Sequence, residues 1–195
     1  MKIRPAWAGA LWALALFAAG VAQAAGEGLD PNLVRKLTPG PGACLGDGTA
    51  YVSARIRGAL NMDLNWKDAQ LACAGDSRPD GSGLRVSFAG PGPGGRVLRL
   101  VFGITAAREG KAGRDLPTNL TVLVDGGRIF ATQGDDKCTT DKLSQHQLPA
   151  SPGIRAWRIQ ARGFCVTPAN AIDGRGRILV SRFDFAGRVE FAGVK

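Results

Sequence analysis

The sequence predicts an all-β fold, either a two-sheet β-sandwich or, as the alternative, a closed barrel. From Tyr51 onward, short apolar or alternating runs are separated by clusters of Gly, Pro and Asp, which is the pattern of short strands joined by turns. The helical period of 3.6 residues is nearly absent from this part of the chain. A chain of 195 residues fits one domain of this kind, which we place at residues 51–195.

Residues 1–24 have the three parts of a secretory signal peptide. Lys2 and Arg4 precede an uncharged apolar run that ends in Ala22-Gln23-Ala24, and small residues at these positions are typical of a cleavage site. No later run reaches the roughly 20 apolar residues that cross a bilayer, so we expect no transmembrane helix. We therefore expect an exported protein, periplasmic or secreted, and the abundance of Arg, Ala and Gly favours a bacterial source.

Residues 25–50 form an N-terminal segment for which we predict one short helix. Asp30 is placed as its N-cap and Pro31 as its first residue, because an Asp cap followed by Pro suits a helix start. The helix would run through Leu37, since the Pro- and Gly-rich stretch from Thr38 cannot continue it.

Nine strands are predicted in the following domain, and they match two packed sheets. Their ranges are 51–57, 60–66, 84–88, 96–104, 120–124, 128–132, 156–166, 177–185 and 188–191. Residues 121–130 and 183–191 are predicted hairpins, the first around Asp125-Gly126-Gly127. Three long loops, residues 74–83, 106–119 and 134–153, are where a functional site would be sought.

The four cysteines, Cys44, Cys73, Cys138 and Cys165, predict two disulfides, because an even number in an exported chain is typical of an oxidising compartment. Three pairings are possible. We favour Cys44 with Cys73 and Cys138 with Cys165, since these close loops of similar length and fit neighbouring strands.

Signatures of catalysis and of cofactor binding are missing. His146 is the one histidine, and no Gly-x-Ser-x-Gly motif accompanies it. The glycine-rich run 90–95 precedes a predicted strand rather than the helix that a dinucleotide site requires. We expect no cofactor and incline against an enzyme. Asp135, Asp136 and Asp141 are the acidic loop residues that calcium or a hydrolase would use, although they lack the EF-hand order.

Positive charge is the remaining indication of function, with 25 Lys and Arg against 16 Asp and Glu. Strand alternation places Arg158 and Arg162 on one face of their strand. Arg99 and Arg182 each interrupt an apolar run, so each must point outward or find a partner. If these strands are neighbours, the four arginines form a patch for an acidic protein or an anionic envelope polymer. The alternative is ordinary solvated surface, and no nucleic-acid-binding signature is present.

These observations predict an exported, non-enzymatic envelope protein: a binding, inhibitor or accessory module with a basic face. Two alternatives stay open. One is a small secreted hydrolase that uses the loop carboxylates, and the other is a structural domain that assembles with itself through an exposed sheet edge.

Overall fold

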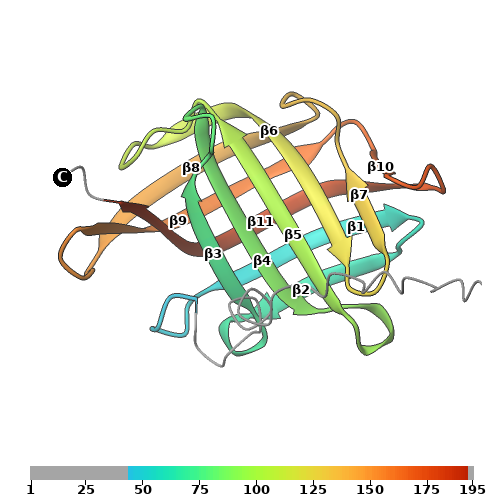
Figure 1. Ribbon diagram of the computed structural model, residues 1–195, viewed down its shortest axis with the longest axis horizontal. Coiled ribbons are helices and arrows are strands. Elements are labelled where there is room, and N and C mark those ends of the chain that lie inside the picture. Colours follow the sequence, from blue (N-terminus) through green and yellow to red (C-terminus); the bar gives the residue numbers. More distant parts are fainter. Residues whose placement is uncertain (1–43, 193–195) are drawn as a thin grey trace, which may run out of the picture.

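The all-β prediction is confirmed by the computed structural model, which describes residues 44–192 (Figure 1). All of its strands belong to one antiparallel sheet. The strands are β1 (Tyr51–Gly58), β2 (Met62–Lys67), β3 (Ala72–Ser77), β4 (Gly83–Pro91), β5 (Val97–Thr105), β6 (Gly113–Val124), β7 (Arg128–Ala131), β8 (Cys138–Leu148), β9 (Ile154–Cys165), β10 (Ala169–Ala171) and β11 (Arg177–Ala192). Two short 3-10 helices, η1 (Asp68–Gln70) and η2 (Pro93–Gly95), join strands.

The sheet folds over into two packed layers that cross at a large angle. In Figure 1 the near layer contains β3, β4, β5, β6 and β7, and β2, β1, β11 and β9 run across behind it. We call these the front layer and the back layer, with β8 beside β9 in the back layer. The end strands of the hydrogen-bonded order are β2 and β3. The two packed layers correspond to the predicted sandwich, although they are parts of one continuous sheet and not two separate sheets.

Long strands connect the two layers. β6 pairs with β8 through residues 113–118 and with β7 through residues 121–124. β11 pairs with β9 and β10 on one side and with β1 on the other. Two hydrogen-bonded routes, through β7 and β10 and through β8 and β9, thus join β6 to β11.

The core between the layers is built on phenylalanine. Phe88 and Phe102 from the front layer meet Phe183 and Phe185 from the back layer, and all four are fully buried. The Phe102 ring centroid lies 4.9 Å from that of Phe183 and 4.8 Å from that of Phe185. Aliphatic side chains surround these rings. The alternation of apolar residues along each strand supplies this core.

The predicted hairpin at residues 183–191 is wrong, because these residues lie within the single strand β11. Phe183, Phe185, Val189 and Phe191 are all buried, as expected. Gly187 continues the same inward face, and its missing side chain leaves room for Phe88: a Cβ there would lie 2.7 Å from that ring. Gly187 is thus a packing residue and not a turn residue. The other predicted hairpin is confirmed as β6 and β7.

Both disulfides have the favoured pairing, Cys44–Cys73 and Cys138–Cys165. The first ties the segment before β1 to β3. The second joins residues directly opposite each other in the β8–β9 ladder. Each bridge closes a loop and so restricts the unfolded chain, which stabilises the folded protein by about 2 to 4 kcal/mol.

The three predicted long loops contain strands that the sequence pattern did not reveal. β3 lies in residues 74–83 and the stretch before them, β6 begins within 106–119, and β8 occupies most of 134–153. These strands carry few buried apolar side chains, so their alternation is faint. The predicted signal peptide and the predicted helix at residues 30–37 lie outside the described residues.

Candidate functional site

Three of the four predicted binding arginines lie on the outer side of the back layer. Arg158 and Arg162 are on β9, and Arg182 is on the neighbouring strand β11. Arg99 is on β5 of the front layer, between Ala89 of β4 and Leu123 of β6. The four arginines therefore do not form one patch, because the two layers present opposite outer surfaces.

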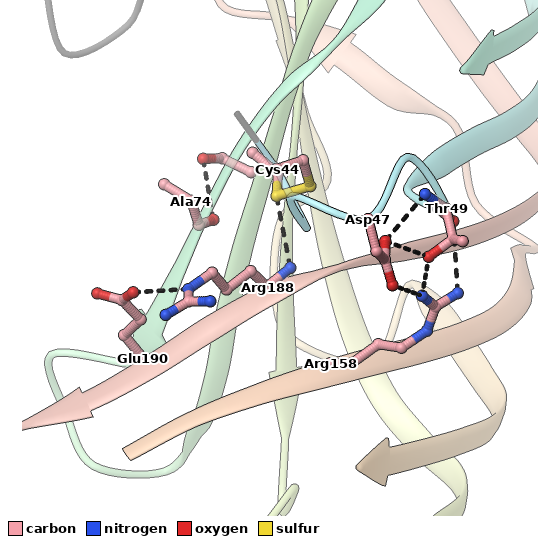
Figure 2. The surroundings of a disulfide bond; sticks show 9 residues. Cys44, Asp47, Thr49, Ala74, Arg158, Arg188 and Glu190 are labelled. Atoms are coloured by element: carbon pink, nitrogen blue, oxygen red, sulfur yellow. Dashed lines mark hydrogen bonds and ion pairs between the residues drawn. A yellow bond between two sulfur atoms is a disulfide. The ribbon is translucent and has the colours of Figure 1, made fainter. Parts of the chain in front are cut away.

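Arg158 is engaged by the loop that precedes β1. Figure 2 shows its guanidinium reaching Asp47 and Thr49, close to the Cys44–Cys73 bridge. The nearest Arg158 nitrogen lies 3.6 Å from Oδ2 of Asp47, and Nη2 donates to the Thr49 carbonyl oxygen at 3.3 Å. Nη1 also donates to the Thr49 hydroxyl. Arg158 thus fastens this loop to the sheet and is not available as a free cation.

Arg162 belongs instead to a row of three exposed cations on three adjacent strands. Lys142 of β8 is directly opposite Arg162 of β9. On its other side, Lys142 is directly opposite Arg114 of β6. We call Arg114, Lys142 and Arg162 the cation row; all three are exposed. None of them forms an ion pair with a residue of the described chain.

Such an arrangement opposes folding, because like charges directly opposite each other across a ladder repel. Neighbouring strands lie about 4.8 Å apart, so the row presents successive positive charges at about that spacing. The next position in the row is Asp184 of β11, opposite Arg162, whose carboxylate is bound by Tyr51. Asp184 thus borders one end of the cation row, but it forms no ion pair with Arg162, and the other two cations have no carboxylate opposite them in the ladder.

A second opposed pair extends the basic surface. Arg55 of β1 is directly opposite Arg182 of β11. Asp63 neutralises the β1 side, with its Oδ1 at 3.7 Å from Arg55 and 2.8 Å from Arg57. Arg182 has no ion pair among residues 44–192. We use the term basic face for the cation row together with Arg182.

A shallow groove of about 320 Å³ lies beside the cation row. Its walls are residues 112–114 of the strand start and residues 142–144 of β8, so Arg114 and Lys142 both border it. Ala112 adds a small apolar surface and Ser144 adds a hydroxyl, whereas Leu143 is buried behind the groove. A bound group here meets two cations together with a small apolar surface.

Comparison of the chain with family models, curated proteins and solved structures gives no match.

Two of the three carboxylates proposed for calcium or hydrolysis, Asp135 and Asp136, have basic partners in the structure, and Asp141 forms no ion pair with a described residue. Asp135 accepts two hydrogen bonds from Arg78, at 2.9 and 3.2 Å, and one from Asn119. Asp136 pairs with Lys137 at 2.9 Å. In residues 44–192 no group of three or more His, Cys, Asp or Glu side chains gathers as metal ligands would. Asp135 acts as part of a clamp across the outer side of the front layer.

That clamp depends on Arg78, which also binds Asp80 through Nη2 at 3.0 Å. It lies over Gly103 of β5, where a Cβ would come within 2.9 Å of the guanidinium. The hydrogen bonds from Arg78, aided by those from Ser82, hold the pKa of Asp80 well below its usual value. Arg78 thereby fixes the β3–β4 turn to the loop before β8.

The loop between β5 and β6 is held by side chains of β8 and β9. Gln145 of β8 accepts from the Gly110 amide and donates to the carbonyl oxygens of Arg108 and Lys111, at 3.0, 2.7 and 2.8 Å. Glu109 accepts two hydrogen bonds from Arg155, at 2.6 and 2.8 Å, and one from the Trp157 indole at 3.1 Å. These bonds lower the pKa of Glu109 against the opposing effect of burial.

Tyr51 lies on the outer side of the back layer, where its hydroxyl donates to Oδ1 of Asp184 at 2.6 Å. Partial burial of the phenol, together with this bond to a carboxylate, raises the pKa of Tyr51 to about 12 from an ordinary value of 10.0. Both effects act in the same direction, because each disfavours a second negative charge beside Asp184.

We expect the Tyr51 phenol to ionise about two pH units above an unfolded tyrosine. Between pH 10 and 12 the unfolded chain loses this proton while the folded chain keeps it, so the Tyr51 contribution to stability is complete below pH 10 and is lost as pH rises through 12. Tyr51 is the sole tyrosine of the sequence, so tyrosinate absorbance reports it alone. If the tyrosinate absorbance had its midpoint near pH 10 while the circular dichroism spectrum stayed native, the contact between Tyr51 and Asp184 would be contradicted.

Sequence reasoning missed Arg114 and Lys142. Arg114 was in a predicted loop, and Lys142 was in another. What makes them a site is the register of β6, β8 and β9, which depends on two long-range pairings. The available sequence signal was the clustering of charge in these loops, which gave no indication of their position relative to Arg162.

Proposed function

We propose that the chain is an exported, non-enzymatic binding module of the bacterial envelope that holds a linear anionic polymer on its basic face. The observation that carries this proposal is the cation row: Arg114, Lys142 and Arg162 on adjacent strands, opposed in register and without ion pairs in the described chain. The repulsion within the cation row does not stabilise the fold. We therefore infer that the row serves to bind a negatively charged partner, which would neutralise it.

An extended polymer suits this surface better than a folded acidic protein. The row crosses three adjacent strands at paired positions, and each step between strands advances about 4.8 Å. A linear chain with a charged group on successive units can follow that line and place small parts in the groove beside Arg114 and Lys142. We infer that binding is dominated by charge and weakens strongly as salt is added.

Export is part of the same proposal. The signal-like residues 1–24 support it, and so do the two disulfides, which persist in oxidising compartments. Over residues 44–192, no helix has the length and apolar character required to cross a membrane. The envelope is also where anionic polymers are available to an exported protein.

The test compares the oxidised protein with the triple variant Arg114→Gln, Lys142→Gln, Arg162→Gln. Affinity for fluorescent polygalacturonate is measured at several salt concentrations, with neutral dextran as the uncharged polymer. We expect the variant to bind at least about tenfold more weakly. Its salt dependence should also be shallower, because a protein that makes fewer charge contacts releases fewer counterions on binding.

The matched control removes the same charge from the front layer, as Arg85→Gln, Arg96→Gln, Arg99→Gln. These residues lie on β4, on the β4–β5 connection and on β5, away from the cation row. We expect this variant to keep most of the affinity. Equal loss in both triple variants would mean that net charge alone drives binding, and preference for an acidic globular protein over the polymer would overturn the choice of partner.

A further inference from the structure

A second pocket, separate from the cation row, opens at the end of the sandwich. It has a volume of about 410 Å³ and takes its walls from both layers. The β3–β4 turn and the β5–β6 loop supply one side, and Arg155 of β9 and Phe191 of β11 supply the other. Pockets of this size hold small molecules, and the open end of a layered β fold is a common place for them.

The floor of this pocket is apolar. Leu84, Ala107 and Phe191 line it with side chains that are 1%, 8% and 7% exposed. Gly81 and Gly83 add backbone rather than side chains to the wall. At Gly83 the close approach of β4 to β5 excludes a side chain, since a Cβ would lie 2.0 Å from the carbonyl oxygen of Ile104. These side chains offer a small apolar area at the base of a pocket whose lining is otherwise polar.

The rim of the pocket carries one excess positive charge. Glu109 neutralises Arg155 through two hydrogen bonds. Arg108 also lines the pocket and is exposed. No carboxylate of the described chain forms an ion pair with Arg108. A guanidinium in this position binds carboxylate or phosphate through paired, charge-assisted hydrogen bonds.

The loop that carries Arg108 is already fixed in place. Gln145, Arg155 and Trp157 hold its backbone and the Glu109 side chain. At its start Ala106 adopts a φ of 60°, a left-handed conformation that costs a non-glycine residue free energy. A loop held this way needs little further ordering when a ligand binds, which favours affinity.

We propose that this pocket binds a small amphipathic anion, with its carboxylate or phosphate on Arg108 and a short apolar chain on Leu84, Ala107 and Phe191. This proposal is independent of the polymer site, because it uses a different pocket and a different cation. The ligand class follows from the single excess charge at the rim and the apolar floor below it.

The Trp157 indole provides a built-in reporter, because its N–H donates to Glu109 beside the pocket. The second indole in the described chain, that of Trp66, donates to the Pro91 carbonyl oxygen and serves as an internal reference. Octanoate and octyl phosphate are titrated into the ¹⁵N-labelled, oxidised protein while both indole resonances are followed. We expect a saturable shift of the Trp157 signal with either anion, and binding of octanol at least about tenfold weaker.

Arg108→Gln should weaken octanoate binding by about tenfold or more, whereas Lys111→Gln, which removes one positive charge at the other end of the same loop, should leave it unchanged. Arg108 is exposed, so the substitution leaves the core intact. Absence of a saturable Trp157 shift, octanol binding as tight as octanoate, or equal affinity in the Arg108 variant would each overturn the proposal. Polygalacturonate binding by Arg108→Gln, measured in parallel, shows separately whether the polymer site is intact.

Discussion

Phe102→Ala is expected to destabilise the protein by about 3 to 5 kcal/mol, the range for removing a fully buried phenylalanine. Phe102 is 0% exposed and contacts rings from both layers, those of Phe88, Phe183 and Phe185. Its removal leaves a cavity at the point where the layers meet, and rings held by two crossing sheets have little freedom to collapse into it. The loss is large against the roughly 5 to 15 kcal/mol that stabilises a typical domain.

Urea unfolding of the oxidised protein measures this effect, with Phe164→Ala as the matched control. Phe164 lies on β9 and is 36% exposed, so truncating it removes much less buried surface. The midpoint should fall strongly for Phe102→Ala and only slightly for Phe164→Ala. Similar midpoints for the two variants would show that the phenylalanine cluster does not hold the layers together.

Gly163→Ala is the second change for which we expect a large effect, a loss of about 3 kcal/mol, at the upper end of the usual range for overpacking. A Cβ at Gly163 would lie 2.0 Å from the carbonyl oxygen of Thr139 and 2.6 Å from the Phe183 ring. The Thr139 carbonyl belongs to the backbone of β8, close to the bulge between Thr140 and Lys142. The methyl group can be accepted only if β8 and β9 move apart.

Gly127→Ala is the matched control for this substitution. Gly127 lies in the β6–β7 turn, and a Cβ there meets nothing within 4 Å. Thermal unfolding monitored by circular dichroism should show a large decrease in Tm for Gly163→Ala and a small change for Gly127→Ala. A Gly163→Ala protein as stable as the wild type would mean that the β8–β9 ladder tolerates a wider spacing than the structure has.

The sequence was sufficient to predict the fold class and the disulfides. Runs such as Val97 to Ile104 alternate or stay apolar because each strand has an inner face, and this pattern survives in the sequence. Cysteine number and spacing were enough to favour the observed pairing. Strand β8 was missed because residues such as Thr139, Lys142 and Ser144 face away from the core. A strand that is mostly polar has no periodic signal to detect.

The candidate sites were less predictable because they depend on register. Gly187 looked like a turn residue, yet its role is to make room for Phe88 from another layer, which a local pattern cannot reveal. Arg99 and Arg162 both have apolar neighbours in the sequence, so the local pattern gives the same prediction for each: an outward-facing arginine on a strand. Only the strand order assigns them to different layers. The bulge in β8 then sets Lys142 opposite Arg162.

The pairing of β11 with β1 also determines when the fold can form. β1 spans residues 51–58, and its ladder partner begins only at Arg177. A chain that has emerged from a ribosome only up to that residue leaves Val52, Ala54 and Ile56 paired with β2 alone, without β11 on their other side. Contacts so distant in sequence form slowly. The back layer must therefore assemble after nearly the whole described chain has been delivered, and until then its apolar strand faces depend on protection from aggregation.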